Sequence, residues 1–514
     1  MHACLSVDEI IRFLAHGLVA SGGRATAVAL AGCCKRFEDP VLDVLWREQG
    51  LFYPLLDTLP ESVWDEASEA LVSSLLTGSF LSAQILAVKT FKRAPTTVEW
   101  ARFKKYARRM RELKLDLSEE PISSHILSVL QLHTLNESLL PNLKVLELKG
   151  TTSDIIPFIP LFLSHRTTHI DIQFSIYIIL PTVMLASMII NLPKLCPDIQ
   201  SIALSPLPRG SAITNATSEM LLACNPDALQ NFQVDSALTE EANRVLFQLP
   251  NLRSLWTVFA EPIPLPDVSL PNLTDLDIEY YHDHYWLRAF QAAKFSRLAG
   301  VTFRVECNRI GNLLETFEST ALATSAFSTI SYFAIYASCP WNPSYHSLLA
   351  FRQLAELVLE FSCHNGCSSR IDDDTVISLA QSMPKLEVLQ IGKTPCQAPG
   401  NVTIRGLIAL AYHCPGLSTL RIHFQTDSLI VEVANEAGRP LPESYLPRHV
   451  CALTTLEVGE IPIQPQNAFF VLFPLLRIFP HLRDIEYVDE NWKWIAEIVG
   501  LCRQTDSLVH RTGK

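Results

Sequence analysis

The chain has 514 residues and a mass of 57.5 kDa, more than one compact core supports, so several domains or a long repeat array are expected. Its 41 basic and 53 acidic side chains give a net charge of −12, which disfavours nucleic acid as a partner and favours basic proteins. Hydrophobic residues make up 48% and charged residues 18%, a balance that excludes a disordered chain.

Cysteine usage and the first residues bear on the compartment. The 13 cysteines are an odd number and are scattered, whereas a secreted disulfide scaffold would be shorter and denser in cysteine. Residues 1–4 lack a basic start followed by an apolar run, so no signal peptide is predicted. We therefore expect a reducing compartment, either the cytoplasm or the nucleus.

Residues 4–48 predict three short helices. The first begins near Asp8, which can cap it, and the Ser-Gly-Gly run at residues 21–23 ends it. A small, apolar second helix covers residues 25–34, and the third begins with Pro40 in its first turn. Three helices in 45 residues bury little by themselves, so this unit is expected to dock its apolar face on a partner. The alternative is a cap that shields the end of a repeat array.

The order and spacing of residues in this segment resemble an F-box. The matching runs are Leu5-x-x-x-Glu9-Ile10, Ala29-Leu30-x-x-Cys33-Cys34-Lys35-Arg36-Phe37 and Pro40-x-Leu42-x-x-x-Trp46-Arg47. Asp8 stands where the family usually has a proline. The resemblance implies that a Skp-type adaptor binds this module. Some apolar positions of the match will form the module's own core, and the expected adaptor-binding residues are Leu5, Val7, Ile10, Leu14, Cys33, Phe37, Leu45 and Trp46.

A connector and a basic cluster follow the module. Residues 49–107 predict a rigid connector with amphipathic helices, one of them beginning at residue 60 and covering residues 60–76. The run RFKKYARRMR at residues 102–111 is strongly basic. Because the chain as a whole is acidic, we interpret this run as a solvated helix that leads into the first repeat, rather than as a nucleic-acid patch.

The pattern apolar-x-x-apolar-x-apolar recurs 14 times over residues 108–490, in units that start 21 to 36 residues apart. Clear copies are LKVLEL from Leu143, LTDLDI from Leu273 and LEVLQI from Leu386. Many copies follow an apolar-Pro-x preface, such as LPN at Leu140, where proline ends a helix and the chain turns into a strand. Helices are expected between the strands, as over residues 374–383.

One strand–helix unit cannot bury its apolar side alone, whereas stacked units share a continuous core. The series resembles leucine-rich repeats of the longer, helix-containing type. The sequence therefore predicts an α/β fold, in which a small helical F-box precedes a curved leucine-rich-repeat solenoid with a parallel concave sheet. The alternative is an ordinary doubly wound α/β domain. The expected domains are the F-box (1–48), the helical connector (49–107), the solenoid (108–490) and a C-terminal cap (491–514).

Three segments interrupt the repeats. Residues 174–190 are 17 residues without a charge, which raises the possibility of a membrane span. Polar groups and Pro181 interrupt this run between two repeat units, so we expect a buried strand and a buried helix, and no membrane. Residues 261–270 predict a proline-rich connector, and residues 427–449 predict a projecting loop.

Motifs that carry chemistry are few. The chain has neither the glycine-rich phosphate loop nor the Gly-x-Ser-x-Gly elbow. The three aspartates at residues 372–374 predict a helix N-cap. We therefore expect no catalytic residue, no metal and no cofactor. A metal site would require two separate groups to converge, namely His282, Asp283 and His284 with Cys363, His364 and Cys367.

The resemblance implies a substrate-recognition subunit of an SCF-type cullin–RING ubiquitin ligase. Such a subunit performs no chemistry: the adaptor links it to the cullin–RING scaffold, and the repeats hold a protein target near a ubiquitin-charged enzyme. One alternative is a non-catalytic repeat scaffold that has no ligase. Another is an enzyme whose site the sequence does not reveal.

The third, fifth and seventh positions of each repeat are expected on the concave sheet face. Of these 42 positions, 13 are acidic and four are basic, whereas a merely solvated face would carry both signs about equally. The alternative is that exposed strand positions are simply polar. We expect a basic protein target, with aromatic residues among its anchors. The expected target-binding residues are Trp256, Asp275, Asp277, Glu279, Arg304, Tyr332, Tyr336, Glu356 and Glu360.

Overall fold

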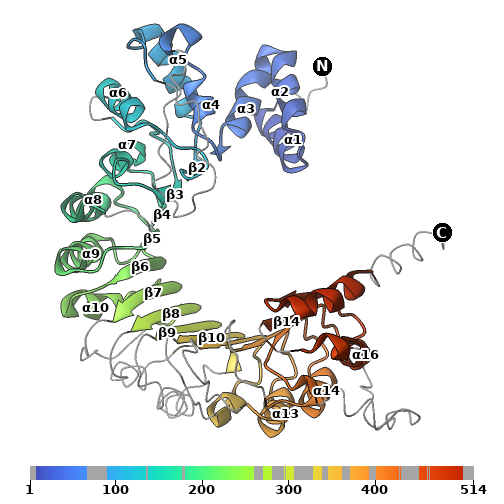
Figure 1. Cartoon of the computed structure of the whole chain (residues 1–514). Coiled ribbons are helices and arrows are strands. Elements are labelled where there is room, and N and C mark those ends of the chain that lie inside the picture. Colours follow the sequence, from blue (N-terminus) through green and yellow to red (C-terminus); the bar gives the residue numbers. More distant parts are fainter. Residues whose placement is uncertain are drawn as a thin grey trace. The chain divides into compact units, whose positions relative to one another are not determined.

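The computed structural model describes residues 7–65, 90–134, 137–175, 180–259, 270–280, 295, 297–305, 328–337, 345–361, 371–392, 401–427, 429, 451–459, 461 and 463–501. The chain forms two compact units, residues 1–251 and residues 252–514. Figure 1 labels the helices and strands of both units.

Three helices open the first unit and form what we call the helical module: α1 (Asp8–Ala20), α2 (Arg24–Cys33) and α3 (Lys35–Leu45). The turn between α1 and α2 contains Gly22 at φ +80°, which confirms the predicted break. The helices pack around one apolar core, whose buried members are Ile11, Ala15, Ala27, Phe37, Val41, Val44 and Leu45.

Two predicted helix starts in the module are wrong. Asp8 does not cap α1, because the capping position is Val7 and no side chain makes a capping hydrogen bond there. The third helix begins at Lys35, because Cys34 is extended at φ −162° and ψ 155° and separates α2 from α3. Pro40 consequently lies inside α3 and not in its first turn.

The connector links the module to the first long strand. It contains β1 (Glu48–Gln49), α4 (Tyr53–Leu56), the 3-10 helix η2 (Glu61–Val63) and α5 (Thr97–Ala107). The predicted helix over residues 60–76 is wrong for residues 60–65, since only η2 is helical there and Trp64 forms an antiparallel bridge with Phe91. Residues 66–76 lie outside the described residues. Thr96 and Glu99 form a capping box at the start of α5, which fixes where this helix begins.

The rest of the first unit consists of strand–helix repeats. Strands β1 to β6 are parallel and neighbour one another in sequence order, and helices α6 to α10 lie along one side of them (Figure 1). The strands are β2 (Glu112–Asp116), β3 (Val145–Thr151), β4 (His169–Phe174), β5 (Ser201–Ser205) and β6 (Asn231–Ala237). The helices are α6 (Ser124–Thr134), η3 (Ile156–Phe158), α7 (Ile159–Phe162), α8 (Thr182–Leu195), α9 (Ser211–Ala223) and α10 (Glu240–Leu246).

The second unit continues the same plan with parallel strands in sequence order. Its strands are β7 (Ser254–Phe259), β8 (Asp275–Tyr280), β9 (Gly300–Val305), β10 (Tyr332–Ala337), β11 (Glu356–Phe361), β12 (Val388–Ile391), β13 (Thr419–Arg421), β14 (Thr455–Gly459) and β15 (Asp484–Tyr487). Its helices include η6 (Tyr345–Ala350), α13 (Asp373–Ser382), α14 (Ile404–His413), η8 (Pro465–Asn467), α16 (Ala468–Ile478) and η9 (Glu490–Trp492), and residues 493–501 are also helical.

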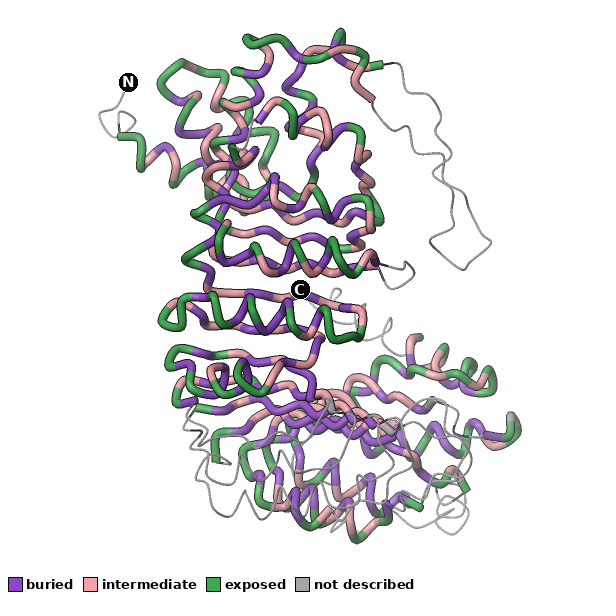
Figure 2. Tube along the Cα trace, turned by 90° about the vertical axis from the view of Figure 1, so that its left-hand side faces the viewer, coloured by how far each residue is buried: buried purple, intermediate pink, exposed green. Residues whose placement is uncertain are grey.

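Burial alternates along the strands as the repeat pattern predicts. Leu143, Leu146 and Leu148 are buried, whereas Val145 and Glu147 between them are only half-buried. Figure 2 shows buried and exposed positions alternating along the helices that cover the sheet. The apolar positions point toward the helices, and the intervening positions point to the other side of the sheet, which we call the open face. The predicted α/β architecture of stacked strand–helix repeats is therefore confirmed.

Two smaller sequence predictions concern residues 174–190 and Asp372, and the second is confirmed. The first, a buried strand and a buried helix, holds only in part: Phe174 ends β4, residues 176–179 lie outside the described part, and α8 follows Pro181 at its N-cap with Val183 78% exposed. Among the described residues, no helix is both long and apolar enough to cross a membrane. Asp372 caps α13 by accepting a hydrogen bond from the backbone N–H of Thr375 at 2.9 Å. The predicted connector over residues 261–270 and loop over residues 427–449 lie almost entirely outside the described residues.

Candidate functional site

The structure divides the residues expected to bind an adaptor into two groups. Val7, Leu14 and Cys33 are exposed, and Ile10 and Trp46 are half-buried. Phe37 and Leu45 belong to the buried core of the helical module and present little surface to a partner. Leu5 lies outside the described residues.

A residue that the family resemblance did not single out is the most exposed apolar side chain of the module. Phe13 is 77% exposed on α1. Val7, Ile10, Phe13 and Leu14 occupy positions i, i+3, i+6 and i+7, so they form one stripe along α1, which we call the module face. The helical period places Phe13 next to Ile10 and Leu14 on the helix surface, but the packing of α1 decides that this side is exposed. On α2, Val28 is 57% exposed and adds a second apolar position.

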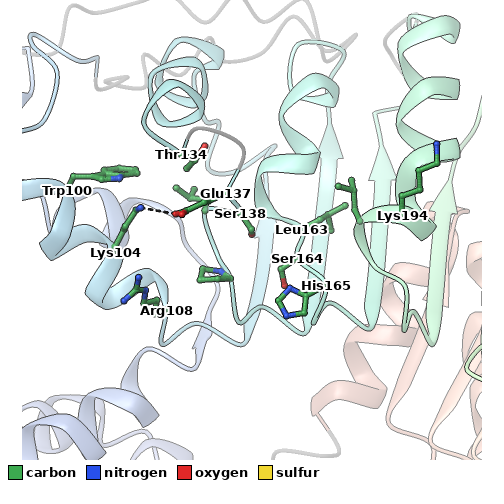
Figure 3. A pocket seen from close by; sticks show the side chains of 13 residues that line it. Trp100, Lys104, Arg108, Thr134, Glu137, Ser138, Leu163, Ser164, His165 and Lys194 are labelled. Atoms are coloured by element: carbon green, nitrogen blue, oxygen red, sulfur yellow. Dashed lines mark hydrogen bonds and ion pairs between the residues drawn. The ribbon is translucent and has the colours of Figure 1, made fainter. Parts of the chain in front are cut away.

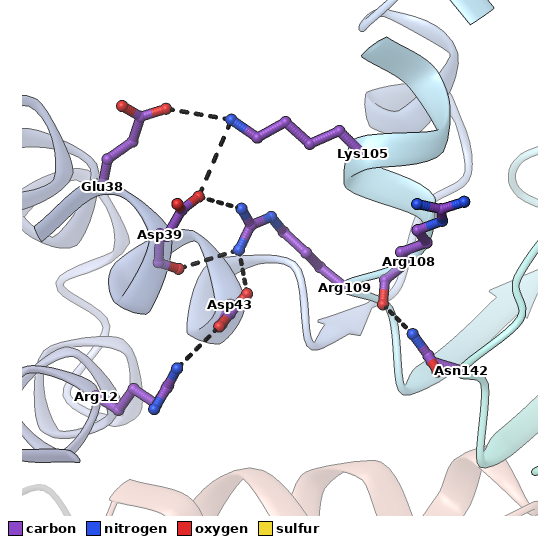
Figure 4. A network of polar contacts seen from close by, with 8 residues as sticks. All are labelled: Arg12, Glu38, Asp39, Asp43, Lys105, Arg108, Arg109 and Asn142. Carbon is purple, nitrogen blue, oxygen red and sulfur yellow. Dashed lines mark hydrogen bonds and ion pairs between the residues drawn. The ribbon is translucent and has the colours of Figure 1, made fainter. Parts of the chain in front are cut away.

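A network of ion pairs joins the helical module to Lys105 on α5 and to Arg109, which follows α5 (Figure 4). The guanidinium of Arg109 contacts the carboxylates of Asp39 and Asp43 and donates to the carbonyl oxygen of Asp39 at 3.1 Å. Lys105 lies 3.5 Å from Glu38, and Arg12 lies 3.3 Å from Asp43. For Arg109, which is only 11% exposed, the interpretation as part of a solvated helix is therefore wrong.

The backbone strengthens the same junction. The carbonyl oxygen of Arg47 accepts hydrogen bonds from the N–H groups of Arg111 at 2.8 Å and Glu112 at 2.9 Å. The ring centres of Trp46 and of Tyr106 on α5 are 4.8 Å apart. Part of the expected adaptor surface, Trp46, thus serves the contact between the helical module and the connector.

All nine residues expected to bind a target lie on the adjacent strands β7 to β11. The strand register places them in three rows across the open face. The first row contains Asp275, Tyr332 and Glu356, the second contains Trp256 and Asp277, and the third contains Glu279, Arg304, Tyr336 and Glu360. The sequence prediction that these residues gather on one surface therefore agrees with the strand pairing.

Arg304 is the centre of the third row. Its Nη2 donates to Asp277 Oδ2 at 2.9 Å, and its Nε donates to Asp277 Oδ1 at 3.2 Å. The guanidinium also lies 5.8 Å from the ring centre of Trp256 and 5.1 Å from that of Tyr336, within range of cation–π attraction. Burial raises the pKa of Asp277 even though Arg304 opposes that shift. The guanidinium of Arg304 therefore lies between the Asp277 carboxylate and the rings of Trp256 and Tyr336.

A second arginine joins three strands of the open face. Arg421 on β13 contacts Glu360 on β11 at 2.6 Å and also contacts Glu457 on β14. Glu457 accepts a further hydrogen bond from Gln390 at 2.8 Å. The sequence identified the charges of Arg421 and Glu457 but not their pairing. Asp275, Glu356 and Glu486 have no ion-pair partner among the described residues, so the uncompensated charge of this face is negative.

Other chemistry is sparse in the described part of the chain. No group of three or more histidine, cysteine, aspartate or glutamate side chains there can hold a metal ion. The two candidate groups at residues 282–284 and 363–367 lie outside the described residues. Burial raises the pKa of the Cys196, Cys224 and Cys414 thiols to about 12, so these groups are protonated and are poor nucleophiles at neutral pH.

Comparison with known proteins adds little. No family model matches the chain, and none of the curated proteins matches it. A chain from the crystal structure of the Rad7 and Elc1 complex in yeast is similar at 18% sequence identity with a TM-score of 0.37. The similarity covers 59% of this chain and 77% of that chain. A likeness at this level neither identifies a family nor assigns a function.

Proposed function

We propose that the chain is the substrate-recognition subunit of an SCF-type cullin–RING ubiquitin ligase. In this proposal the module face docks on a Skp-type adaptor, and a cullin–RING scaffold joins through that adaptor. The open face of strands β7 to β11 holds a basic protein target. The observation that supports the proposal most is the exposed apolar stripe on α1, in a three-helix module whose sequence resembles an F-box.

The module face has the character of a docking surface. Large apolar side chains that cluster on a surface often mark an interaction site. Burying a side chain such as Phe13 or Leu14 stabilises a complex by about 1.5–3 kcal/mol. The carboxylates of Asp39 and Asp43 instead pair with Arg109, which follows α5. The apolar face is thus left for a partner, while the charged residues hold the module in place.

The junction between the helical module and the repeats fits a receptor that works by holding its target close to an enzyme. A receptor of this kind performs no chemistry, and it raises the local concentration of its target near a ubiquitin-charged enzyme. Contacts from Arg109, Arg47 and Trp46 fix the module against α5 and β2 within the first unit. A fixed junction narrows the positions that a bound adaptor can take relative to these first repeats.

The adaptor step can be tested with substitutions in the full chain. Phe13→Asp and Leu14→Asp together place two charges in the module face, and we expect at least about a 100-fold loss of affinity for a purified Skp-type adaptor. Val183→Asp is a matched control, because Val183 is 78% exposed on α8 and lies outside the module. Affinity is measured by calorimetry, and co-purification of the cullin is scored in parallel.

Point substitutions separate the outcomes better than removal of residues 1–48. That truncation also deletes Glu48 from β1 and the Arg47 carbonyl that accepts hydrogen bonds ahead of β2, so it disturbs the first repeat. If the double variant binds the adaptor as well as the control does, the module face is not the docking surface. If the unmodified chain captures neither adaptor nor cullin, the alternative of a repeat scaffold without a ligase replaces the proposal.

A further inference from the structure

A pocket of about 490 Å³ lies in the first unit, where the chain turns from one repeat into the next strand (Figure 3). Its walls come from α5, the end of α6, the segment before β3, the segment before β4 and the end of α8. Leu139 and Leu163 are buried and provide an apolar floor. Trp100 closes one end, and its indole Nε1 has no hydrogen-bond partner among the described residues.

The rim of this pocket is positive although the chain carries a net charge of −12. Lys104 lies 3.0 Å from Glu137, the one carboxylate that lines the pocket. Arg108 and Lys194 are exposed and have no carboxylate partner among the described residues. His165 is also exposed on the rim. Three permanent cations therefore face one carboxylate, the opposite of the balance on the open face of the sheet.

The spacing of the cations decides the kind of anion. Arg108 ends α5 before β2 and Lys194 lies in the last turn of α8 before β5, so the strands that follow them are three strand intervals, or about 14 Å, apart. Figure 3 shows these two side chains at opposite ends of the pocket. One phosphate group cannot contact both, whereas about four residues of an extended peptide span that distance. Acidic side chains at its two ends can then reach Arg108 and Lys194.

We propose that this pocket binds an extended acidic peptide that crosses the segments preceding β2 to β5. Carboxylates of the peptide pair with Arg108 and Lys194, and an apolar side chain between them packs on Leu139 and Leu163. This site is separate from the module face and from the open face of β7 to β11, and it does not depend on the proposed ligase function. The chain thus has one surface for acidic and another for basic protein segments.

The test uses a fluorescein-labelled nonapeptide made of three repeats of Glu-Leu-Glu and the full-length chain. Arg108→Glu with Lys194→Glu should weaken binding at least about tenfold, because it removes two cations and introduces two repulsive charges. Arg352→Glu with Lys385→Glu is the matched control, since these cations precede β11 and β12 in the second unit. Fluorescence anisotropy gives the dissociation constants, and circular dichroism checks that each variant is folded.

Two further arms distinguish the peptide from other ligands. A peptide of Gln-Leu-Gln repeats should bind at least about tenfold more weakly than the acidic one, because it lacks the charges that pair with the rim. Inorganic phosphate at about 10 mM should displace little of the acidic peptide beyond what equal ionic strength of chloride displaces. Equal binding by the two double variants, equal binding of the two peptides, or specific displacement by phosphate would each overturn the proposal.

Discussion

The module face and the open face of β7 to β15 present two contrasting surfaces of one chain. The module face is apolar and highly exposed, with Phe13 its most prominent side chain. The open face of the second unit contains eight acidic and two basic side chains, and both of its arginines form ion pairs. The helical module exposes apolar side chains. In the sheet, Arg304 and Arg421 pair with carboxylates on neighbouring strands, and Arg304 also lies near two aromatic rings.

This contrast indicates how each surface would recognise a partner. Apolar burial is largely independent of ionic strength, while attraction between exposed charges falls as salt screens them. The module face is therefore suited to a constant partner such as an adaptor, and the open face is suited to selection among charged targets. Arg304 and Arg421 complicate the second surface, because they are structural elements of the sheet as well as parts of the candidate site.

The largest expected effect concerns Arg421. Arg421→Met should lower the free energy of unfolding by about 3 kcal/mol, because it leaves Glu360 and Glu457 without a cation in a largely buried site. The side chains of Arg421 and Glu457 are only 16% and 12% exposed. Urea unfolding measures the change, and Arg405→Met at an exposed position on α14 is the control. A loss below about 1 kcal/mol would mean that this pair contributes no more than an exposed salt bridge.

A smaller effect is expected for target recognition. Asp275→Lys with Glu356→Lys should weaken capture of a labelled basic peptide, made of Lys-Leu-Lys repeats, by about tenfold at low salt. Asp277 is left unchanged, because its reversal would also break the ion pair with Arg304. Glu219→Lys with Glu241→Lys changes the net charge equally on the helices α9 and α10 and serves as the control.

Anisotropy measures binding of the basic peptide, and proteins captured from cells are compared at the same salt. The difference between the two double variants should shrink when the salt rises from about 50 mM to about 500 mM. If both variants lose binding equally, net charge and not the open face attracts the peptide. If neither loses binding, the acidic open face does not take part, and the projecting loop predicted over residues 427–449 becomes the next candidate.

The sequence predicts the repeat architecture well because each strand carries its own signal. Leu143, Leu146 and Leu148 show the alternation of buried positions without reference to any other part of the chain. The pairing of Arg304 with Asp277 is different, since it depends on the register between strands separated by a long connection. The pocket around Leu139 and Leu163 depends on the same kind of alignment across several repeats. Patterns within one segment can therefore be predicted from the sequence, whereas contacts between distant segments cannot.

The helical module illustrates the same limit in a helix. Phe13 and Phe37 are both aromatic residues of a short apolar segment, yet Phe13 is exposed and Phe37 is buried. The difference arises from how α1 packs against α3, which the spacing of apolar residues within one helix does not fix. Two neighbouring arginines of the basic run at residues 102–111 also differ in their surroundings. Arg109 contacts Asp39 and Asp43 of α3, whereas Arg108 lines the pocket.

The smallest expected effect is on stability, and it concerns the ion pairs of Arg109 that join the helical module to the connector. Arg109→Ala should reduce stability by about 1 kcal/mol, because its partners Asp39 and Asp43 are exposed enough for water to screen the ion pairs. The loss should nearly vanish at about 500 mM salt. Arg108→Ala changes the neighbouring arginine, which has no ion-pair partner among the described residues, and should leave stability unchanged. Thermal unfolding at both salt concentrations measures these differences.

Arg109→Ala also tests whether adaptor binding and anchoring of the helical module depend on different residues. Arg109 does not contribute to the module face, so Arg109→Ala should bind the Skp-type adaptor within about twofold of the unmodified chain. Hydrogen exchange in α1 to α3 should nevertheless quicken, because an anchor of these helices on the segment after α5 is lost. A large loss of adaptor affinity in Arg109→Ala, without unfolding, would show that the adaptor needs the junction itself, and the apolar stripe on α1 would then be only part of the docking surface.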